Sequence, residues 1–98
     1  MTMNDLDFLF NETTPGDINK KIAGRIRAIR KRRKISQKEL GEKSGVSLGS
    51  VKRFEQSGEI SLLSLTKIAI ALEIDDEMKN LFTDVPFQSI EEIKNAKD

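Results

Sequence analysis

Apolar residues recur at helical spacing along most of this chain, and each stripe that they form predicts an amphipathic helix with one buried face. The first stripe consists of Ile18, Ile22, Ile26 and Ile29. It predicts a helix over residues 15–34 whose other faces carry cationic side chains. Thr14 suits the N-cap of this helix, Pro15 suits its first position, and Asp17 stands at capping-box spacing.

Serine residues predict the starts of three further helices, because a serine at the N-cap accepts a hydrogen bond from the first turn. The three N-caps are Ser36, Ser47 and Ser61. The helices are expected over residues 37–44, 48–56 and 62–72. Glu39 would complete a capping box with Ser36, and Gly45 and Gly58 stand where the first two helices end. The third helix has the apolar stripe Leu62, Leu65, Ile68, Ala69 and Leu72.

Two weaker helical patterns follow. A short helix over residues 75–82 would carry acids in its first turn, where the helix dipole favours them. Pro86 ends that pattern, because the residue before a proline is pushed out of the helical region. Ser89 and Glu92 then form another capping box, which predicts a weak last helix. The amino-terminal segment MNDLDFLFN has no clear period, and no segment is predicted as a strand.

These elements predict an all-α fold in one domain, since 98 residues suffice for one hydrophobic core and not for two. We expect a five-helix domain over residues 14–84, an amino-terminal tail over residues 1–13 and a carboxy-terminal extension over residues 85–98.

The composition excludes most classes of enzyme for this chain. The chain has no cysteine and no histidine, which excludes zinc fingers, disulfide frameworks, thiol nucleophiles and imidazole acid-base chemistry. It also has no metal-ligand spacing and no glycine loop for phosphate, so we expect no catalysis and no cofactor. No secretory signal and no membrane-spanning stretch is recognisable, and we expect a cytoplasmic protein.

The net charge of +1 conceals a strong asymmetry along the chain. Residues 17–53 hold thirteen Lys or Arg against three Asp or Glu, a net charge of +10. The segments on either side are acidic, with −3 over residues 1–16 and −6 over residues 54–98. Such a concentrated basic segment suits a polyanion, because neutralised phosphates release counterions. The alternative is a merely solvated basic helix.

The most specific pattern lies between Gln37 and Gln56. Two helices that cross steeply at a short turn need a small residue where their backbones approach, and Gly41 stands there. They also need a residue that tolerates a positive φ in the turn, which Gly45 provides. Apolar contacts between the two helices would come from Leu40, Val46, Val51 and Phe54.

This segment resembles the helix-turn-helix of the Cro and phage-repressor (XRE) family of DNA-binding regulators. Together with IAGRIRAIRKRRKIS before it and ISLLSLTKIAIAL after it, it resembles the five-helix lambda-repressor-like domain over residues 18–82. The resemblance implies sequence-specific binding of double-stranded DNA by a transcriptional regulator such as a repressor. It further implies that residues 47–56 form the recognition helix in the major groove.

The resemblance also assigns contact residues by matching position. Those facing the bases would be Ser47, Leu48, Gly49, Ser50 and Lys52. Arg53 would lie near a base or a phosphate, and Gln37 would contact phosphate with Ser36 and Lys38 close by. Leu48 and Gly49 are poor donors and acceptors, so DNA shape would carry part of the specificity.

Two further features have a structural interpretation. The basic run over residues 30–34 gains from the helix dipole without any ligand, and it would add long-range steering. Arg30 matches the family arginine that pairs with a glutamate of the recognition helix, here Glu55. The loop after that helix departs from the family pattern, because Gly58 stands three residues after Glu55, whereas many relatives have a glycine two residues after that glutamate. In addition, Glu59 is acidic, and Ile60 stands near the position of the usual proline.

One recognition helix covers few base pairs, so the resemblance implies a homodimer that spans two half-sites about 34 to 36 Å apart. Leu63 and Ile70 lie off the main stripe of their helix. They would either meet Ile74, Met78 or a tail at a two-fold interface, or pack inside the chain. The intramolecular partners would be Ile90, Ile93 or the amino-terminal LDFLF.

Two other functions remain open at this point. Apolar extensions on a short helix-turn-helix protein resemble those of antitoxins that bind DNA and a toxin partner together. The same scaffold also serves pure protein-interaction modules, because fold does not determine function. A toxin gene beside this one would favour the first, and DNA binding without steep salt dependence would favour the second.

Overall fold

The computed structural model describes residues 14–96, and within them every regular element is a helix. The helices are α2 (Pro15–Arg32), α3 (Gln37–Ser44), α4 (Leu48–Ser57), α5 (Leu62–Ala71), α6 (Asp75–Lys79) and α7 (Ile90–Ala96). The predicted all-α fold is confirmed. The expected role of the LDFLF segment concerns residues outside the described part of the chain.

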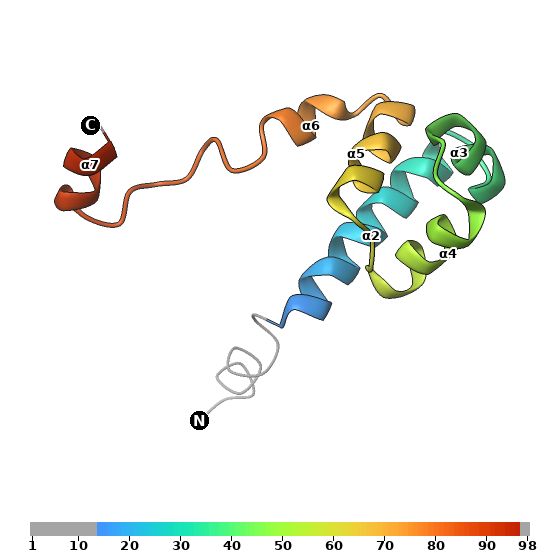
Figure 1. Cartoon of the computed structure of the whole chain (residues 1–98), viewed down its shortest axis with the longest axis horizontal. Coiled ribbons are helices and arrows are strands. Elements are labelled where there is room, and N and C mark those ends of the chain that lie inside the picture. The colour runs from blue at the N-terminus through green and yellow to red at the C-terminus, as the bar shows by residue number, and fades with distance from the viewer. Residues whose placement is uncertain (1–13, 97–98) are drawn as a thin grey trace.

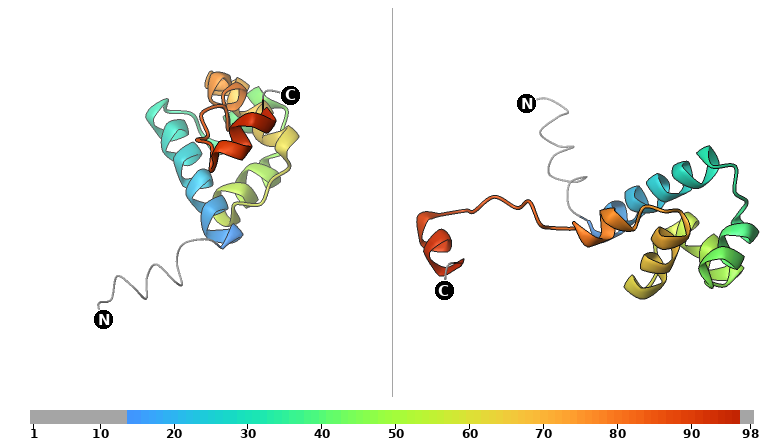
Figure 2. Two further views of the ribbon diagram at one scale, coloured as in Figure 1. Left: turned by 90° about the vertical axis from the view of Figure 1, so that its left-hand side faces the viewer. Right: turned by 90° about the horizontal axis from the view of Figure 1, so that it is seen from above.

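Helix α2 forms one side of the molecule and packs mainly against α4, while α3 packs against α4 and α5 (Figure 1). Helix α6 follows at the end of α5, and a long connection then leads away from the other helices to α7. The view from above shows the same separation of α7 (Figure 2, right).

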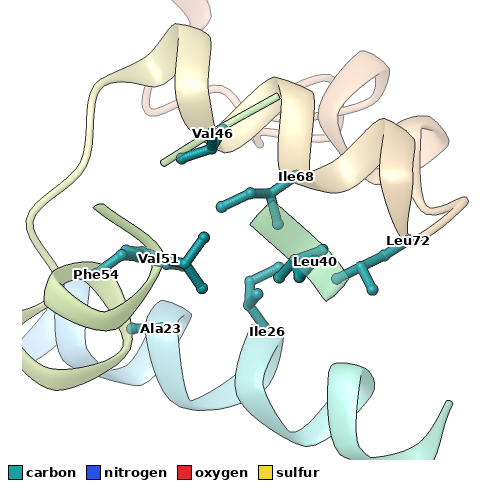
Figure 3. Close-up of a cluster of buried hydrophobic side chains, with 8 residues drawn as sticks. All are labelled: Ala23, Ile26, Leu40, Val46, Val51, Phe54, Ile68 and Leu72. Carbon is teal, nitrogen blue, oxygen red and sulfur yellow. The ribbon is translucent and has the colours of Figure 1, made fainter. Parts of the chain in front are cut away.

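The core lies where α2, α3, α4 and α5 meet (Figure 3). Its largest fully buried side chains are Phe54, Leu40, Ile68, Leu72 and Val51. Burial of each such side chain contributes about 1.5 to 3 kcal/mol, so this cluster holds the four helices together. Helix α4 contributes Val51 and Phe54 to this cluster, so the core anchors α4 along one face.

Side-chain caps define the helix starts as expected. The hydroxyl of Thr14 accepts a hydrogen bond from the Asp17 amide at 3.3 Å. Ser36 and Glu39 form the full capping box, with two reciprocal hydrogen bonds of 3.0 Å. The Ser47 and Ser61 hydroxyls cap α4 and α5 by accepting a hydrogen bond from the amides of Ser50 and Ser64.

The helix ends differ from the expected ones by a few residues. Helix α2 stops at Arg32, because Lys34 adopts a positive φ of 57° and the chain turns there. Helix α6 stops at Lys79, and Phe82, expected inside that helix, has a φ of 65° and is exposed. Helix α4 continues to Ser57, one residue further than expected.

The apolar stripes are also buried over a shorter length than expected. Ile18 and Leu62, the first members of their stripes, are 46% and 68% exposed. Both lie in the first turn of a helix, near the end of the bundle. There Gly58 approaches α2 so closely that a Cβ on it would lie 2.7 Å from the carbonyl carbon of Asn19. Only a glycine fits at this position, because a side chain would clash with α2 and because Gly58 has a φ of 84°.

Candidate nucleic-acid interface

The turn between α3 and α4 depends on two glycines in the expected way. A Cβ on Gly41 would lie 2.9 Å from the backbone oxygen of Val46, a distance that real Cβ atoms essentially never show. Gly45 ends α3 with a φ of 76°, in the left-handed region that favours glycine. The apolar contacts expected from Leu40, Val46 and the two inward residues of α4 are all buried. These residues therefore produce two closely packed helices joined by a sharp turn.

Helix α4 has two faces of opposite character. Val51 and Phe54 are 0% and 1% exposed and face the core. The opposite face is exposed from the N-cap onward, and it carries Ser47, Leu48, Gly49, Ser50, Lys52 and Arg53. Within residues 14–96 no element covers this outer face. A rigid helix thus presents small, apolar and cationic side chains to a partner.

An ion pair ties α4 to α2. The Arg30 guanidinium donates two hydrogen bonds to the Glu55 carboxylate, from Nε to Oε2 at 2.7 Å and from Nη2 to Oε1 at 2.9 Å. Its Nη1 donates to the backbone oxygen of Ile35 at 2.8 Å. Both side chains are nearly buried. The expected structural pair is present, and it sets the orientation of α4 on its scaffold.

A family model described as helix-turn-helix matches residues 26–77, more than half of the chain. The chain belongs to the Cro/C1-type helix-turn-helix (XRE) family. Its kind of function is accordingly that of a DNA-binding transcription regulator. The match runs from α2 to α6, and it includes the whole of α3, the turn and α4. No curated protein and no solved structure matches the chain.

In this Cro/C1-type domain the expected phosphate contact, Gln37, has an additional partner. Its Nε2 donates a hydrogen bond of 3.1 Å to Glu55 Oε1, so the carboxamide is held at the start of α3. Burial raises the pKa of Glu55, but the hydrogen bonds from Arg30 and Gln37 outweigh it, and the pKa lies below its usual value. Ser36 and Lys38 lie beside Gln37 and are exposed.

The amino-terminal turn of α4 has a small hydroxyl network. Ser47 Oγ accepts a hydrogen bond of 3.1 Å from the Ser50 amide, and it donates one of 2.8 Å to Ser50 Oγ. The Ser47 hydroxyl is thus engaged in capping the helix. The Ser50 hydroxyl keeps its own proton for donation, so it is the better placed of the two to contact a base edge.

The loop after α4 places an acid beside an expected contact residue. Arg53 Nε lies 3.6 Å from Glu59 Oε2, and both side chains are about 70% exposed. An exposed pair of this kind contributes little, so Arg53 can exchange Glu59 for a phosphate. The two residues border a shallow hollow that also contacts Ser50 and Ser61. This departure from the usual family loop was recognisable in the sequence.

Sequence reasoning missed Arg27. Its Nε lies 3.8 Å from Glu55 Oε1, while 53% of its side chain remains exposed. The residue precedes Arg30 by three positions on α2 and so lies on the same face. That spacing is the signal that would have identified it. Arg27 adds a partly exposed cation at the same Glu55 oxygen that accepts the hydrogen bond from Gln37.

Among residues 14–96, no group of three or more His, Cys, Asp or Glu side chains is arranged to hold a metal ion. Over the same residues, no helix combines the length and the apolar character needed to cross a bilayer.

Proposed function

We propose that this protein binds specific sequences of double-stranded DNA as a transcriptional regulator, with α4 as the recognition helix in the major groove. The observation that carries the proposal is the two-faced character of α4. Its inner face is held by Val51, Phe54 and the Arg30–Glu55 pair, whereas its outer face is exposed from Ser47 to Arg53. A helix fixed in this way enters a major groove without rearrangement.

The outer face supplies several kinds of base contact. Lys52 can donate to the O6 and N7 acceptors of guanine, and Ser50 can donate or accept. Leu48, which is 37% exposed, suits the methyl group of thymine. Gly49 has nothing within 4 Å of its Cβ position, so it permits close approach to the DNA. Because these residues offer few donors, we expect DNA shape to supply part of the specificity.

Phosphate contacts are proposed for the start of α3 and for Arg53. The amides at the amino end of a helix attract phosphate oxygens, and Ser36, Gln37 and Lys38 stand at that end of α3. The Glu55 hydrogen bond orients the Gln37 side chain, which keeps an acceptor and a second N–H. The exposed cations of α2 would add steering over a longer range.

We further propose that the protein acts as a homodimer in the cytoplasm. A single α4 contacts too few base pairs for useful selectivity, whereas two copies read two half-sites. Leu63 and Ile70 on α5 are 66% and 58% exposed and do not pack inside residues 14–96, which leaves them available at an interface between copies.

Selection of bound sequences from a random duplex library tests the proposal. We expect inverted repeats, with half-sites separated by about one helical turn. Affinity for the selected duplex should fall by orders of magnitude between about 50 and 200 mM salt, because several phosphate contacts release counterions. Enrichment of no sequence, together with a flat salt response, would mean that the protein is an interaction module.

The antitoxin alternative remains a prediction from the chain extensions. The apolar residues Val85, Phe87, Ile90 and Ile93 are exposed, which suits any protein partner. A neighbouring toxin gene and recovery of a stable complex with its purified product would favour this alternative. An antitoxin of this kind would still bind DNA through α4.

A further inference from the structure

A groove with mainly apolar walls lies between α2, α5 and α6. Its volume is about 250 Å³, and the side chains that form it include Ile22, Ile29, Leu65, Met78 and Leu81. This volume is below the range of about 300 to 1,000 Å³ that is typical of small-molecule sites, so it suits a few apolar side chains better than a ligand. None of its lining residues belongs to α3 or α4. The groove is therefore separate from the proposed DNA surface.

The carboxy-terminal arm, defined as residues 83–96, has apolar side chains without any cover. Val85, Phe87, Ile90 and Ile93 are 63%, 53%, 74% and 38% exposed. Figures 1 and 2 show the arm leading away from the other helices, with α7 at its end. A helix of seven residues is not stable in water by itself, because nucleation costs more than so few hydrogen bonds return. The arm needs a surface on which to fold.

The arm carries an apolar ridge that suits the apolar walls of the groove. Ile90 and Ile93 are three residues apart and share one face of α7, which forms a narrow apolar ridge. Acids flank this ridge at Glu91 and Glu92. Arg25 and Glu77 both line the groove, and α2 exposes further cations at Lys21 and Arg32 outside it. An apolar ridge thus meets a groove with mainly apolar walls, and the acids beside the ridge can face the cations of α2.

We propose that two copies of this chain exchange their carboxy-terminal arms, so that Phe87, Ile90 and Ile93 of one copy occupy the α2–α5–α6 groove of the other. This rests on the homodimer of the proposed function and names a surface for it that is distinct from Leu63 and Ile70. The path of the arm points to a second copy rather than to its own groove. Leu81 lines the groove, and after turns and bends over residues 80–84 the connection leads away from the other helices to α7 (Figure 1). Exchange of an identical segment between protomers is a low-cost route to a dimer.

Arm exchange explains two features together. It buries the exposed apolar side chains of both arms in a dimer, because the interface is two-fold and each arm occupies the groove of the other copy. It also leaves the outer faces of both α4 helices free, since no groove residue lies on α3 or α4. Two recognition helices would then be linked in one particle through their scaffolds.

The first test measures self-association of the full chain by sedimentation equilibrium in the absence of DNA. We expect a dimer, and we expect the double variant Ile90→Asp/Ile93→Asp to raise the dimer Kd at least about a hundredfold, because four apolar anchors are lost per dimer. The matched control Gln88→Asp/Asn95→Asp adds the same charge to the exposed arm without removing an apolar side chain. Unchanged association of the isoleucine variant would overturn the proposal.

Two further measurements show whether the isoleucine variant still folds and still binds DNA. The substituted isoleucines lie outside the core cluster, so the melting temperature of the four-helix core measured at low protein concentration should be equal in variant and control. Binding to a duplex with a single half-site should also be equal in both. Loss of the dimer with retention of half-site binding therefore supports arm exchange, and failure of half-site binding in the unaltered chain bears on the proposed function alone.

The second test distinguishes exchange from docking of the arm within its own chain. The chain has no cysteine, so Ala96→Cys creates a unique site for a nitroxide spin label at the end of α7. Labelled chains at natural isotope abundance are mixed with unlabelled ¹⁵N chains. Exchange predicts broadening of the amide signals of Ile22, Ala69 and Met78 in the ¹⁵N chains. Broadening of these signals only when label and ¹⁵N are in the same chain, or in neither case, would overturn the proposal.

Discussion

The carboxylate of Glu55 on α4 and the guanidinium of Arg30 on α2 form two hydrogen bonds, at 2.7 and 2.9 Å, in a nearly buried position. The same carboxylate accepts from Gln37 at the start of α3. One acid therefore links α4 to both of the helices that position it. This link couples the geometry of the proposed DNA surface to the stability of the fold.

Removal of the Glu55 carboxylate should destabilise the protein more than it alters the DNA contacts. Glu55→Ala leaves Arg30 without its partner in a nearly buried site, which costs about 3 kcal/mol. The free energy of unfolding in urea measures this loss. The matched control is Glu42→Ala, which removes an exposed acid of α3 and should change stability by less than about 0.5 kcal/mol. Equal stability of the two variants would show that the pair is unimportant.

The same carboxylate should make stability depend on pH in the acid range. The pKa of Glu55 is lower in the folded protein than its usual value of about 4.3, so the folded state favours the charged form. Its contribution is fully present above pH 4.3 and declines as the pH falls through the lowered folded-state pKa. We expect the stability difference between the wild type and Glu55→Gln to shrink in urea titrations from pH 6 to pH 3. A constant difference would contradict this origin.

Two glycines on the consecutive helices α3 and α4 should respond in opposite ways to substitution by alanine. Gly41→Ala forces a methyl group against the Val46 carbonyl oxygen and should cost about 1 to 3 kcal/mol, measured by thermal unfolding. Gly49→Ala meets no atom within 4 Å and should raise stability by up to about 1 kcal/mol, because alanine favours the helix.

The second glycine also reports on the DNA surface. If the outer face of α4 lies against base edges, the added methyl group of Gly49→Ala should weaken binding to the selected duplex although the protein is more stable. Fluorescence anisotropy measures this affinity. Undiminished binding by Gly49→Ala would place this part of α4 away from the DNA.

The cations of α4 should contribute directly to affinity. Lys52→Ala should weaken binding about tenfold or more and relax selectivity at one base position, because a base contact is lost. Arg53→Ala should reduce the salt slope by about one if its partner is a phosphate. Lys67→Ala on α5 removes the same charge from an exposed position outside the proposed surface and serves as the control. Normal binding by both α4 variants would refute their assignment.

Much of this architecture could be predicted from the sequence because its determinants are local. The serine caps, the glycine at a positive φ in the turn and the inward residues Val51 and Phe54 all follow from short spacings. The hydrogen bond from Gln37 to Glu55 could not be predicted in this way. It joins side chains 18 positions apart, and it exists only because α3 and α4 cross at the angle that the fold imposes.

The ends of the elements were less predictable for the same reason. Ile18 and Leu62 fit their stripes, yet they are exposed because the bundle ends before the helices do. The Arg27 contact and the α2–α5–α6 groove likewise depend on the packing of several helices. The assignment of base and phosphate contacts to single residues of α4 and α3 stays a prediction.

Amide chemical-shift mapping with the selected duplex tests the role of α4 most directly. The ¹⁵N-labelled chain is titrated with the duplex at low salt, and an unrelated duplex of equal length serves as the control. We expect the largest shifts from Ser47 to Arg53 and at the start of α3 around Gln37, with smaller shifts elsewhere. Saturable binding of the duplex that leaves the α4 amides unshifted would contradict the account.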